Sequence, residues 1–258
     1  MKAETKPTEK KPESKTERKI EAKPREDIEE VVEWEEREEV VEWYEPFERN
    51  LIHLMYGEDG VGKTRLAVAI SKREVENGRR VIYIDTETNN APLVDAIAKY
   101  VTEIHTIYRP YQVRDFVRNY QFKPGDVVII DSIGGIRENW TYYYGRSNVS
   151  DTAPTNMLIT SIVHIISMKW ALLKLQLKAI LITHRSPAIG KTWHGESEAP
   201  TTAQHSMHDV GMVIRIFERD KVDELGNVIA KERIGKIVFD RYNVVGVGKI
   251  FYLPQPVI

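Results

Sequence analysis

The sequence predicts an α/β fold, with a mostly parallel β-sheet flanked by helices and a C-terminal antiparallel β-meander. Short β-branched runs alternate with helix-like segments from residue 51 to residue 183, the pattern of strands that are buried on both faces. A glycine-rich phosphate-binding motif lies between the first predicted strand and the first predicted helix. After residue 208, strand-like segments joined by the turn sequence ELGN replace the helices.

Two segments precede the predicted domain. Residues 1–27 carry nine basic and seven acidic residues and almost no large apolar ones. We expect a disordered charged tail there, because too little apolar surface is available to offset the chain entropy lost on folding. Residues 28–50 carry ten acidic and two basic residues and a tandem nine-residue repeat, EEVVEWEER followed by EEVVEWYEP. This acidic linker is expected either to lie against the domain or to offer Trp34, Trp43 and Phe47 to a partner.

The predicted domain spans residues 51–258 and is mildly basic, with 26 basic and 22 acidic residues. That surplus permits nucleic-acid binding without demonstrating it. Strands are expected at 51–56, 80–85, 103–108, 126–131 and 178–183, and helices at 64–77, 91–101, 111–120 and 155–176. Two long segments, 136–154 and 186–204, are expected to be functional loops that follow core strands.

Composition excludes several classes of protein. The chain has no cysteine, which rules out disulfides and thiolate metal sites. No apolar run is long enough to cross a bilayer, and the charged N-terminus lacks a secretory apolar stretch. We therefore expect a soluble, cytoplasmic protein with no membrane partner.

Residues 57–64, GEDGVGKT, match the P-loop motif G-x-x-x-x-G-K-[ST]. In this motif the loop amides and the helix N-terminus surround phosphate oxygens. Lys63 is expected to reach the β- and γ-phosphates of ATP, and the Thr64 hydroxyl to bind Mg²⁺. The predicted nucleotide-binding residues are Gly57, Glu58, Asp59, Gly60, Val61, Gly62, Lys63, Thr64 and Arg65.

Carboxylates follow two of the predicted strands. DVVIID ends in Asp131, at the carboxyl end of a buried strand, where a Mg²⁺ ligand beside the phosphates is expected. VIYIDTET places Asp85, Glu87 and Thr88 at the end of the strand that follows the first helix. Because neighbouring strands lie about 4.8 Å apart, Glu87 can face the γ-phosphate and take a proton from an attacking water. The alternative is an exposed loop carboxylate that caps the next helix.

With these residues in place, the chain from residue 46 to the end resembles the RecA superfamily, most closely the archaeal RadA and RadB recombinases. VIYIDTE is similar to the strand that carries the family's catalytic glutamate, which maps onto Glu87. VVIIDSIGGIRENWTYYYGRSNV is similar to the Walker B strand and first DNA-binding loop, and AILITHRSP to the strand that ends in Thr-Asn-Gln. AQHSMHDVGMVIRI is similar to the segment that leaves the second DNA loop. ERIGKIVFDR and KIFYL are similar to the closing strands, in which Asp240 takes the place of an ATP-capping aspartate.

This resemblance implies a RecA-like P-loop ATPase that acts on DNA, single-stranded DNA in particular, in homologous recombination or repair. It also implies a homo-oligomer, or an assembly with a related recombinase, in which subunits stack head to tail; Arg241 or Lys249 would then act in trans. The candidate DNA-binding residues of the two loops are Arg137, Trp140, Tyr142, Tyr143, Tyr144, Arg146, Lys191, Trp193 and His194. The alternative is that these aromatic side chains pack the loops onto the domain.

Three features depart from the family pattern. Thr183-His184-Arg185 replaces Thr-Asn-Gln, so the glutamine that relays nucleotide state is missing; Arg185 is the first candidate to replace it as a catalytic contact to the γ-phosphate, and His184 the second. The segment FDRYNVVGVG contains Asp240 but no proline, and the charged tail and repeat replace the N-terminal helix-hairpin-helix domain. Together these features favour an accessory paralogue over the main strand-exchange enzyme. The alternatives are a KaiC-like signalling ATPase that binds no DNA and a recombination mediator that uses ATP as a switch.

Overall fold

The computed structural model describes residues 38–144, 152–187, 194, 196, 198–200 and 208–258. Residues Glu38–Ile258 form one compact unit, so the second copy of the nine-residue repeat is part of the domain. Phe47 is fully buried and Trp43 packs on the same hydrophobic cluster, so this copy lies against the domain. The charged tail and Trp34 of the first copy lie outside the described residues.

The elements of this unit follow the predicted order. The strands are β1 (Ile52–Gly57), β2 (Val81–Asp85), β3 (Glu103–Thr106), β4 (Val127–Asp131), β5 (Lys178–Pro187), β6 (Glu198–Pro200), β7 (Met212–Val222), β8 (Val228–Asp240) and β9 (Ile250–Tyr252). The α-helices are α1 (Lys63–Glu76), α2 (Val94–Ile97), α3 (Pro110–Asn119), α4 (Ile133–Tyr144) and α5 (Thr152–Leu172). Short 3₁₀ segments are η1 (Glu45–Phe47), η2 (Thr88–Leu93) and η3 (Ala98–Tyr100). Over the described part of the chain, no helix combines the length and apolar character that crossing a membrane requires.

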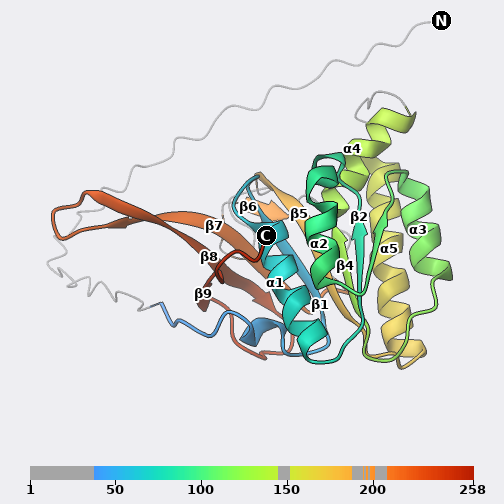
Figure 1. Ribbon diagram of the computed structural model, residues 1–258, viewed down its shortest axis with the longest axis horizontal. Helices are drawn as coiled ribbons and strands as arrows, with labels where there is room; N and C mark the ends of the chain where they lie inside the picture. The colour runs from blue at the N-terminus through green and yellow to red at the C-terminus, as the bar shows by residue number, and fades with distance from the viewer. Residues whose placement is uncertain (1–37, 145–151, 188–193, 195, 197, 201–207) are drawn as a thin grey trace, which may run out of the picture. The chain divides into compact units, whose positions relative to one another are not determined.

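The strands form one mixed sheet in the order β3-β2-β4-β5-β1-β7-β8-β9, with β6 paired to the end of β5. Neighbouring strands are parallel from β3 to β7, and β8 and β9 are added antiparallel. The predicted parallel core and the predicted antiparallel C-terminal strands are both confirmed (Figure 1).

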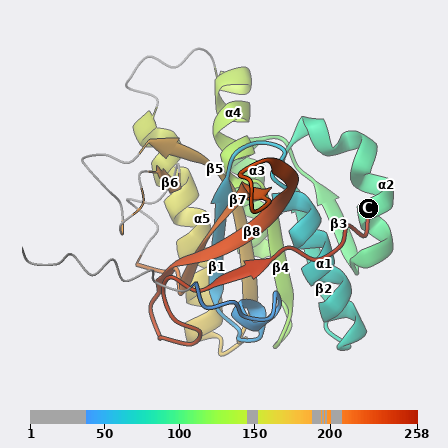
Figure 2. The same ribbon diagram turned by 90° about the vertical axis from the view of Figure 1, so that its left-hand side faces the viewer.

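Helices cover both faces of this sheet (Figure 2). On one face, strand residues such as Leu54 pack against α3, α4 and α5, for example against Ile162. On the other face, Met55 and its neighbours pack against α1, for example against Leu66. Successive residues of a strand point to opposite faces, so strands covered on both sides need the continuous apolar runs that the sequence shows.

The predicted helix at residues 91–101 is a series of short segments, η2, α2 and η3. Pro92 lies inside η2, where it cannot donate a backbone hydrogen bond and its ring crowds the preceding turn. The prediction of one continuous helix is therefore wrong at this point.

The first predicted loop, residues 136–154, begins as helix α4. Ile133, Ile136 and Trp140 recur at helical spacing and are buried in the core, so one face of this segment packs on the domain. The prediction of a loop is therefore wrong as far as Tyr144, and the residues from 145 to 151 lie outside the described ones.

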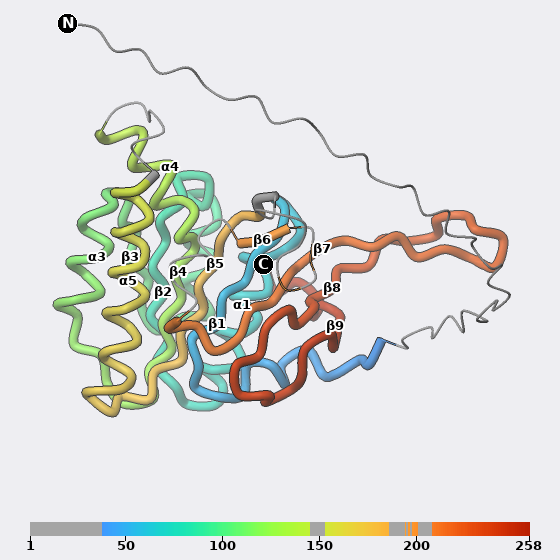
Figure 3. Tube along the Cα trace, turned by 180° about the vertical axis from the view of Figure 1, so that it is seen from behind, coloured from blue at the N-terminus to red at the C-terminus, as the bar shows by residue number. Residues whose placement is uncertain are grey.

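Strands β7 and β8 extend beyond the rest of the sheet. β7 pairs with β1 only as far as Ile216, opposite Gly57, and continues with β8 as a two-stranded hairpin to Val222. At the tip, the Asp223 carboxylate accepts hydrogen bonds from two backbone N–H groups of the turn. Figures 1 and 3 show this hairpin projecting from the body of the domain.

Candidate active site

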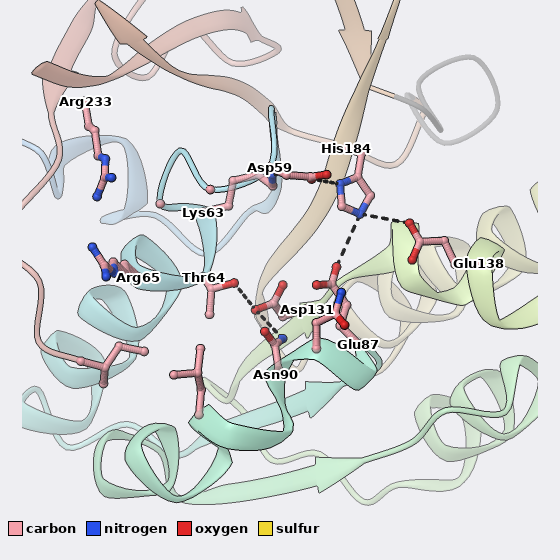
Figure 4. A pocket seen from close by; sticks show the side chains of 15 residues that line it. Asp59, Lys63, Thr64, Arg65, Glu87, Asn90, Asp131, Glu138, His184 and Arg233 are labelled. Carbon is pink, nitrogen blue, oxygen red and sulfur yellow. Dashed lines mark hydrogen bonds and ion pairs between the residues drawn. The ribbon is translucent and has the colours of Figure 1, made fainter. Parts of the chain in front are cut away.

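The carboxyl ends of parallel strands meet at one edge of the sheet, where a cleft of about 460 Å³ lies beside the P-loop. The register places Asp85 opposite Asp131 and Gly57 opposite His184. Side chains that are distant in the sequence therefore converge in this cleft (Figure 4). Open α/β sheets bind their ligands at this edge.

The P-loop turns from β1 into α1. Gly62, the residue before α1, has a φ of 102°, a left-handed conformation that favours glycine. No side chain caps the first turn of α1, so its backbone N–H groups can receive an anion, as phosphate sites at helix N-termini require. Gly57 is needed for a different reason, because a Cβ there would lie 2.1 Å from the carbonyl oxygen of Ile216.

Lys63 begins α1 and is buried beneath the loop. Its Nζ donates to the carbonyl oxygens of Gly57 (3.0 Å) and Glu58 (2.6 Å) and lies 4.0 Å from Asp59 Oδ1. Burial lowers the pKa of Lys63, although Asp59 and the other nearby carboxylates act in the opposite direction. An ammonium held by the carbonyl oxygens of its own loop is placed to exchange them for phosphate oxygens.

Asp131 ends β4 and is almost fully buried. Its Oδ2 accepts hydrogen bonds from Tyr83 OH (2.6 Å), Thr64 Oγ1 (2.8 Å) and Asn90 Nδ2 (3.4 Å). Burial, together with the negative charge of Glu87, raises the pKa of Asp131 to about 6, against the effect of the two hydroxyl donors. The donors around this carboxylate are neutral, which is an unfavourable setting for an anion unless a cation is bound.

The oxygen atoms at this position fit Mg²⁺. The Thr64 hydroxyl and the Asp131 carboxylate lie 2.8 Å apart, and both are the hard ligands that this cation prefers. Two protein ligands suffice, because Mg²⁺ takes the remainder of its shell from water and substrate phosphates. Thr64 and Asp131 are the two residues that the sequence predicts for this role.

Glu87 follows β2 and faces the same cleft. It accepts a hydrogen bond from Ser132 Oγ, and its Oε1 lies 3.6 Å from His184 Nε2. Burial alone would raise the pKa of Glu87, but His184, Ser132 and Lys63 together lower it below its ordinary value. The side chain makes no capping bond to η2, so it does not take the alternative role of a helix cap. It is an anion at neutral pH and can accept a proton from a water in the cleft.

His184 points into the cleft from β5. Its Nδ1 lies 2.7 Å from Asp59 Oδ1 of the P-loop, and its Nε2 lies 3.7 Å from Glu138 Oε1 of α4. The nearby carboxylate of Glu87 raises the pKa of His184. The imidazole therefore joins the P-loop, the candidate base and α4.

Arg185, the first candidate for the γ-phosphate contact, lies away from the cleft. Neighbouring residues of a strand point to opposite faces, so the inward position of His184 turns Arg185 outward. There its guanidinium pairs with Glu58 (2.5 Å) and with Glu198 of β6. In this chain His184 lines the cleft and Arg185 does not, and a contact of either residue with the γ-phosphate stays a prediction.

Two glycines let α4 approach the site closely. A Cβ on Gly134 would lie 2.4 Å from the His184 ring, and a Cβ on Gly135 would lie 3.0 Å from Glu87 Cγ. The first turn of α4 therefore rests directly on the two side chains that face the cleft.

Arg233 of β8 is a site residue that the sequence does not reveal. Its Cδ would lie 3.6 Å from a Cβ on Gly62, and it lines the cleft with Arg65 on the side away from Glu87 (Figure 4). Its Nε donates to Glu218 Oε1 of the same hairpin (3.0 Å). No local pattern marks Arg233, because its position depends on the long-range path of β8 past the P-loop.

Asp240 lies at the opposite end of the sheet from the P-loop, beside the start of β7. Its Oδ2 accepts hydrogen bonds from the backbone N–H groups of Val245 (2.9 Å) and Gly246 (3.0 Å). Asp240 therefore closes a turn and does not line the cleft of its own chain, and its role as an ATP-capping aspartate stays a prediction. Arg241, a candidate for action in trans, follows it at the same end.

The candidate DNA-binding residue Trp140 faces the core. It is 9% exposed, and its ring centroid lies 5.2 Å from that of Tyr111 and 4.8 Å from that of Tyr144. Trp140 therefore packs α4 onto the domain, which is the alternative role considered for the aromatic residues. Arg137 is half-buried on the same helix, and Tyr144 is half-exposed.

The last turn of α4 carries the exposed aromatic side chains. Tyr142 is 82% exposed, and the guanidinium of Arg109 lies 5.6 Å from the ring centroid of Tyr143. Tyrosine rings and guanidinium planes in this arrangement can stack on nucleic-acid bases. Of the remaining candidates, Arg146, Lys191 and Trp193 lie outside the described residues, and the ring centroid of the exposed His194 lies 5.3 Å from that of Phe239.

A comparison with solved structures agrees with this architecture. No protein-family model matches the sequence, and no curated protein matches it. The structure is similar to one described as the crystal structure of the RadB recombinase, with a TM-score of 0.51 and 16% identity; the match covers 79% of this chain and 86% of that chain. The fold is RecA-like. This likeness concerns the fold, and the RecA-like core places the P-loop, Asp131 and Glu87 at its ligand-binding edge.

Proposed function

We propose that this chain binds ATP with Mg²⁺ and hydrolyses it, and that hydrolysis serves an action on single-stranded DNA in recombination or repair. The ATPase part rests on one observation, the convergence of three groups at the end of β1, β2 and β4. These are the P-loop with Lys63, the Thr64–Asp131 pair, and the ionised carboxylate of Glu87. The RecA-like fold supports the proposal, because it brings these groups to one edge.

In the proposed reaction, Lys63 exchanges its loop carbonyls for β- and γ-phosphate oxygens and offsets the charge that develops on them. Thr64 and Asp131 would hold Mg²⁺, which would offset the negative charge of the phosphates. Glu87 orients a water and accepts its proton while the water oxygen bonds to the γ-phosphorus and the bond to ADP breaks. His184 is a positioning residue that keeps the Glu87 carboxylate ionised and directed at the cleft.

The DNA part of the proposal rests on α4. This helix begins beside the catalytic strand β4, and its residue Glu138 contacts His184. Its far end presents Tyr142 and Tyr143, with Arg109 beside them. A stacking and cationic surface is thus joined by one short helix to the nucleotide cleft, which would let DNA and ATP influence each other.

We further propose an accessory paralogue that assembles with itself or with a related recombinase. Thr183-His184-Arg185 stands where the family has Thr-Asn-Gln, so Arg185 takes the position of the relaying glutamine, and it pairs with Glu58 and Glu198. These differences support a role beside a main strand-exchange enzyme. A KaiC-like signalling ATPase, which would hydrolyse ATP without binding DNA, is the competing proposal.

The deciding experiment is a titration of fluorescent single-stranded DNA with and without ATP, at two salt concentrations. Phosphate contacts make affinity fall steeply with salt, so we expect salt-dependent binding that ATP strengthens. The chain with Arg137→Ala and Tyr142→Ala should bind more weakly at unchanged DNA-free ATP turnover. The matched control, Arg118→Ala with Tyr242→Ala, alters an exposed arginine and tyrosine away from that end of α4 and should bind normally. Absent binding, or affinity that ignores salt, would contradict the DNA part and favour the signalling ATPase.

A further inference from the structure

The proposed ATPase makes no use of the nine-residue repeat. Its first six residues, EEVVEW, are identical in the two copies, which span residues 29–34 and 38–43. The second copy lies within the described residues and shows how this sequence docks. The first copy lies outside them.

The second copy docks on the edge of the sheet by strand pairing. Val40 forms a parallel bridge with Ile250 of β9. The Val41 N–H donates to the Ile250 carbonyl (2.9 Å), and the Ile250 N–H donates to the Glu39 carbonyl (3.0 Å). Because β9 is the last strand of the sheet, these bonds satisfy backbone groups of an edge that would otherwise be open to other strands.

Side chains of the second copy match the charge and shape of this edge. Glu39 pairs with Lys249 (2.7 Å), and Glu38 pairs with Arg219 of β7 (2.5 Å). Both pairs are partly exposed, so they select the sign of charge more than they add free energy. Trp43 packs on the hydrophobic cluster beneath. The edge therefore recognises two acidic residues, a strand and a tryptophan.

The two copies differ immediately after the tryptophan. Tyr44 of the second copy donates to Glu74 Oε1 (2.6 Å), a buried carboxylate that also pairs with Lys178. Phe47 is buried just beyond it. The first copy has Glu35 in the position of Tyr44. It keeps every residue that contacts the β9 edge, but it lacks the anchor that fixes the second copy to its own domain.

We propose that the first copy is a docking peptide for a partner protein that presents the same chemistry as the β9 edge. That chemistry is an exposed edge strand, two cationic side chains beside it, and an apolar surface for Trp34. The anchored and closely tethered second copy fills the edge of its own chain. The β9 edge of the same chain is therefore not open to the first copy. The first copy instead binds the partner by adding a strand to its sheet, and Glu29 and Glu30 select an edge that carries basic side chains.

The test uses the whole chain, with its edge vacated, as a surrogate for such a partner. Proline removes the N–H group that bonds to Ile250, and lysine opposes Lys249, so four substitutions disable both copies: Glu30→Lys, Val32→Pro, Glu39→Lys and Val41→Pro. The anchors Tyr44 and Phe47 remain, and thermal unfolding verifies that the variant is folded. The probe is a fluorescent synthetic peptide of residues 28–37, and the control peptide carries Val32→Pro.

We expect the probe to bind the vacated chain at least about tenfold more tightly than the wild-type chain, because the tethered copy competes in the latter. Its affinity should fall as salt rises, and the control peptide should not bind. Equal affinity for the two chains, or for the two peptides, overturns the proposal. Self-association of the wild-type chain that Val32→Pro abolishes also overturns it, because the partner would then be a second copy of this chain.

A second measurement needs no variant. In the wild-type chain, a large excess of the probe should speed hydrogen exchange at the Val41 N–H by displacing it from Ile250. The control peptide should leave this rate unchanged. Exchange that the probe does not alter, at concentrations that saturate the vacated chain, contradicts a shared docking mode.

Discussion

Replacing Asp131 with asparagine should stabilise the nucleotide-free fold while removing the Mg²⁺ site. Burial and the charge of Glu87 raise the pKa of Asp131 from its ordinary 3.8 to about 6. The folded chain therefore holds this proton more tightly than the unfolded chain does. The stabilisation of the fold by the protonated Asp131 carboxyl is fully present below about pH 4 and is lost as the pH rises through about 6. At pH values above that range, this rise in the pKa of Asp131 corresponds to a loss of roughly 3 kcal/mol of unfolding free energy.

Asparagine has the size of aspartate and keeps an oxygen that can accept hydrogen bonds from Tyr83 and Thr64, but it carries no charge. We expect Asp131→Asn to exceed the wild type in unfolding free energy by about 2–3 kcal/mol at pH 7.5. The difference should shrink toward zero near pH 4, where the wild-type carboxyl is protonated in both states.

The assay is urea unfolding of both chains in a chelator at pH 4, 5, 6 and 7.5, followed by the same series with Mg²⁺ and ATP. Ligand should stabilise the wild type and leave Asp131→Asn almost unchanged. A variant that is less stable than the wild type at pH 7.5, or a difference that does not vary with pH, would refute the reasoning. The same chains give ATP turnover, which the substitution should abolish.

Two further predictions concern histidines. Burial lowers the pKa of His53 to about 4, so the stability contributed by its neutral ring is complete above about pH 6.5 and is lost as the pH falls toward 4. His53→Gln can still donate a hydrogen bond to the Pro46 carbonyl, so the thermal midpoint of this variant, measured by circular dichroism, should fall less than that of the wild type between pH 6.5 and pH 4. An equal fall in both chains would contradict this. His184→Ala should lower ATP turnover, measured by phosphate release, about tenfold or more. Arg185→Ala mainly removes the ion pair with Glu58 and should change turnover less than about threefold. The reverse order of the two effects would favour Arg185 as the contact to the γ-phosphate.

The parts of the site that follow strands could be predicted from the sequence. The P-loop, Glu87 and Asp131 are each coded by a local run, and parallel strands bring their carboxyl ends together whatever the details of packing. Only the order of strands was needed to place Asp85 beside Asp131. The same logic predicted the parallel core and the antiparallel closing strands, because each strand carries its own burial pattern.

Site residues that do not directly follow a strand of the parallel sheet could not be predicted from local runs of sequence. Tyr83 and Asn90 bind Asp131, and Arg233 reaches the P-loop through the long-range path of β8, so no local spacing identifies them. Residues 136–144 of α4 are predicted as part of a loop, although Ile133, Ile136 and Trp140 have the spacing of one helical face. His184 and Arg185 are adjacent in β5, and which of the two side chains points into the cleft depends on the orientation of β5 in the sheet.

The central claim, ATP hydrolysis with Glu87 as the base, is tested most directly by single-turnover ATP hydrolysis of Glu87→Gln. Glu138→Gln is the matched control, because Glu138 is a second carboxylate near His184 that lies at 70% exposure. Both variants should bind ATP normally, and only Glu87→Gln should lose hydrolysis, by about 10²-fold or more, the scale of lost general-base help. Unchanged hydrolysis in Glu87→Gln, or an equal loss in both variants, would contradict the account.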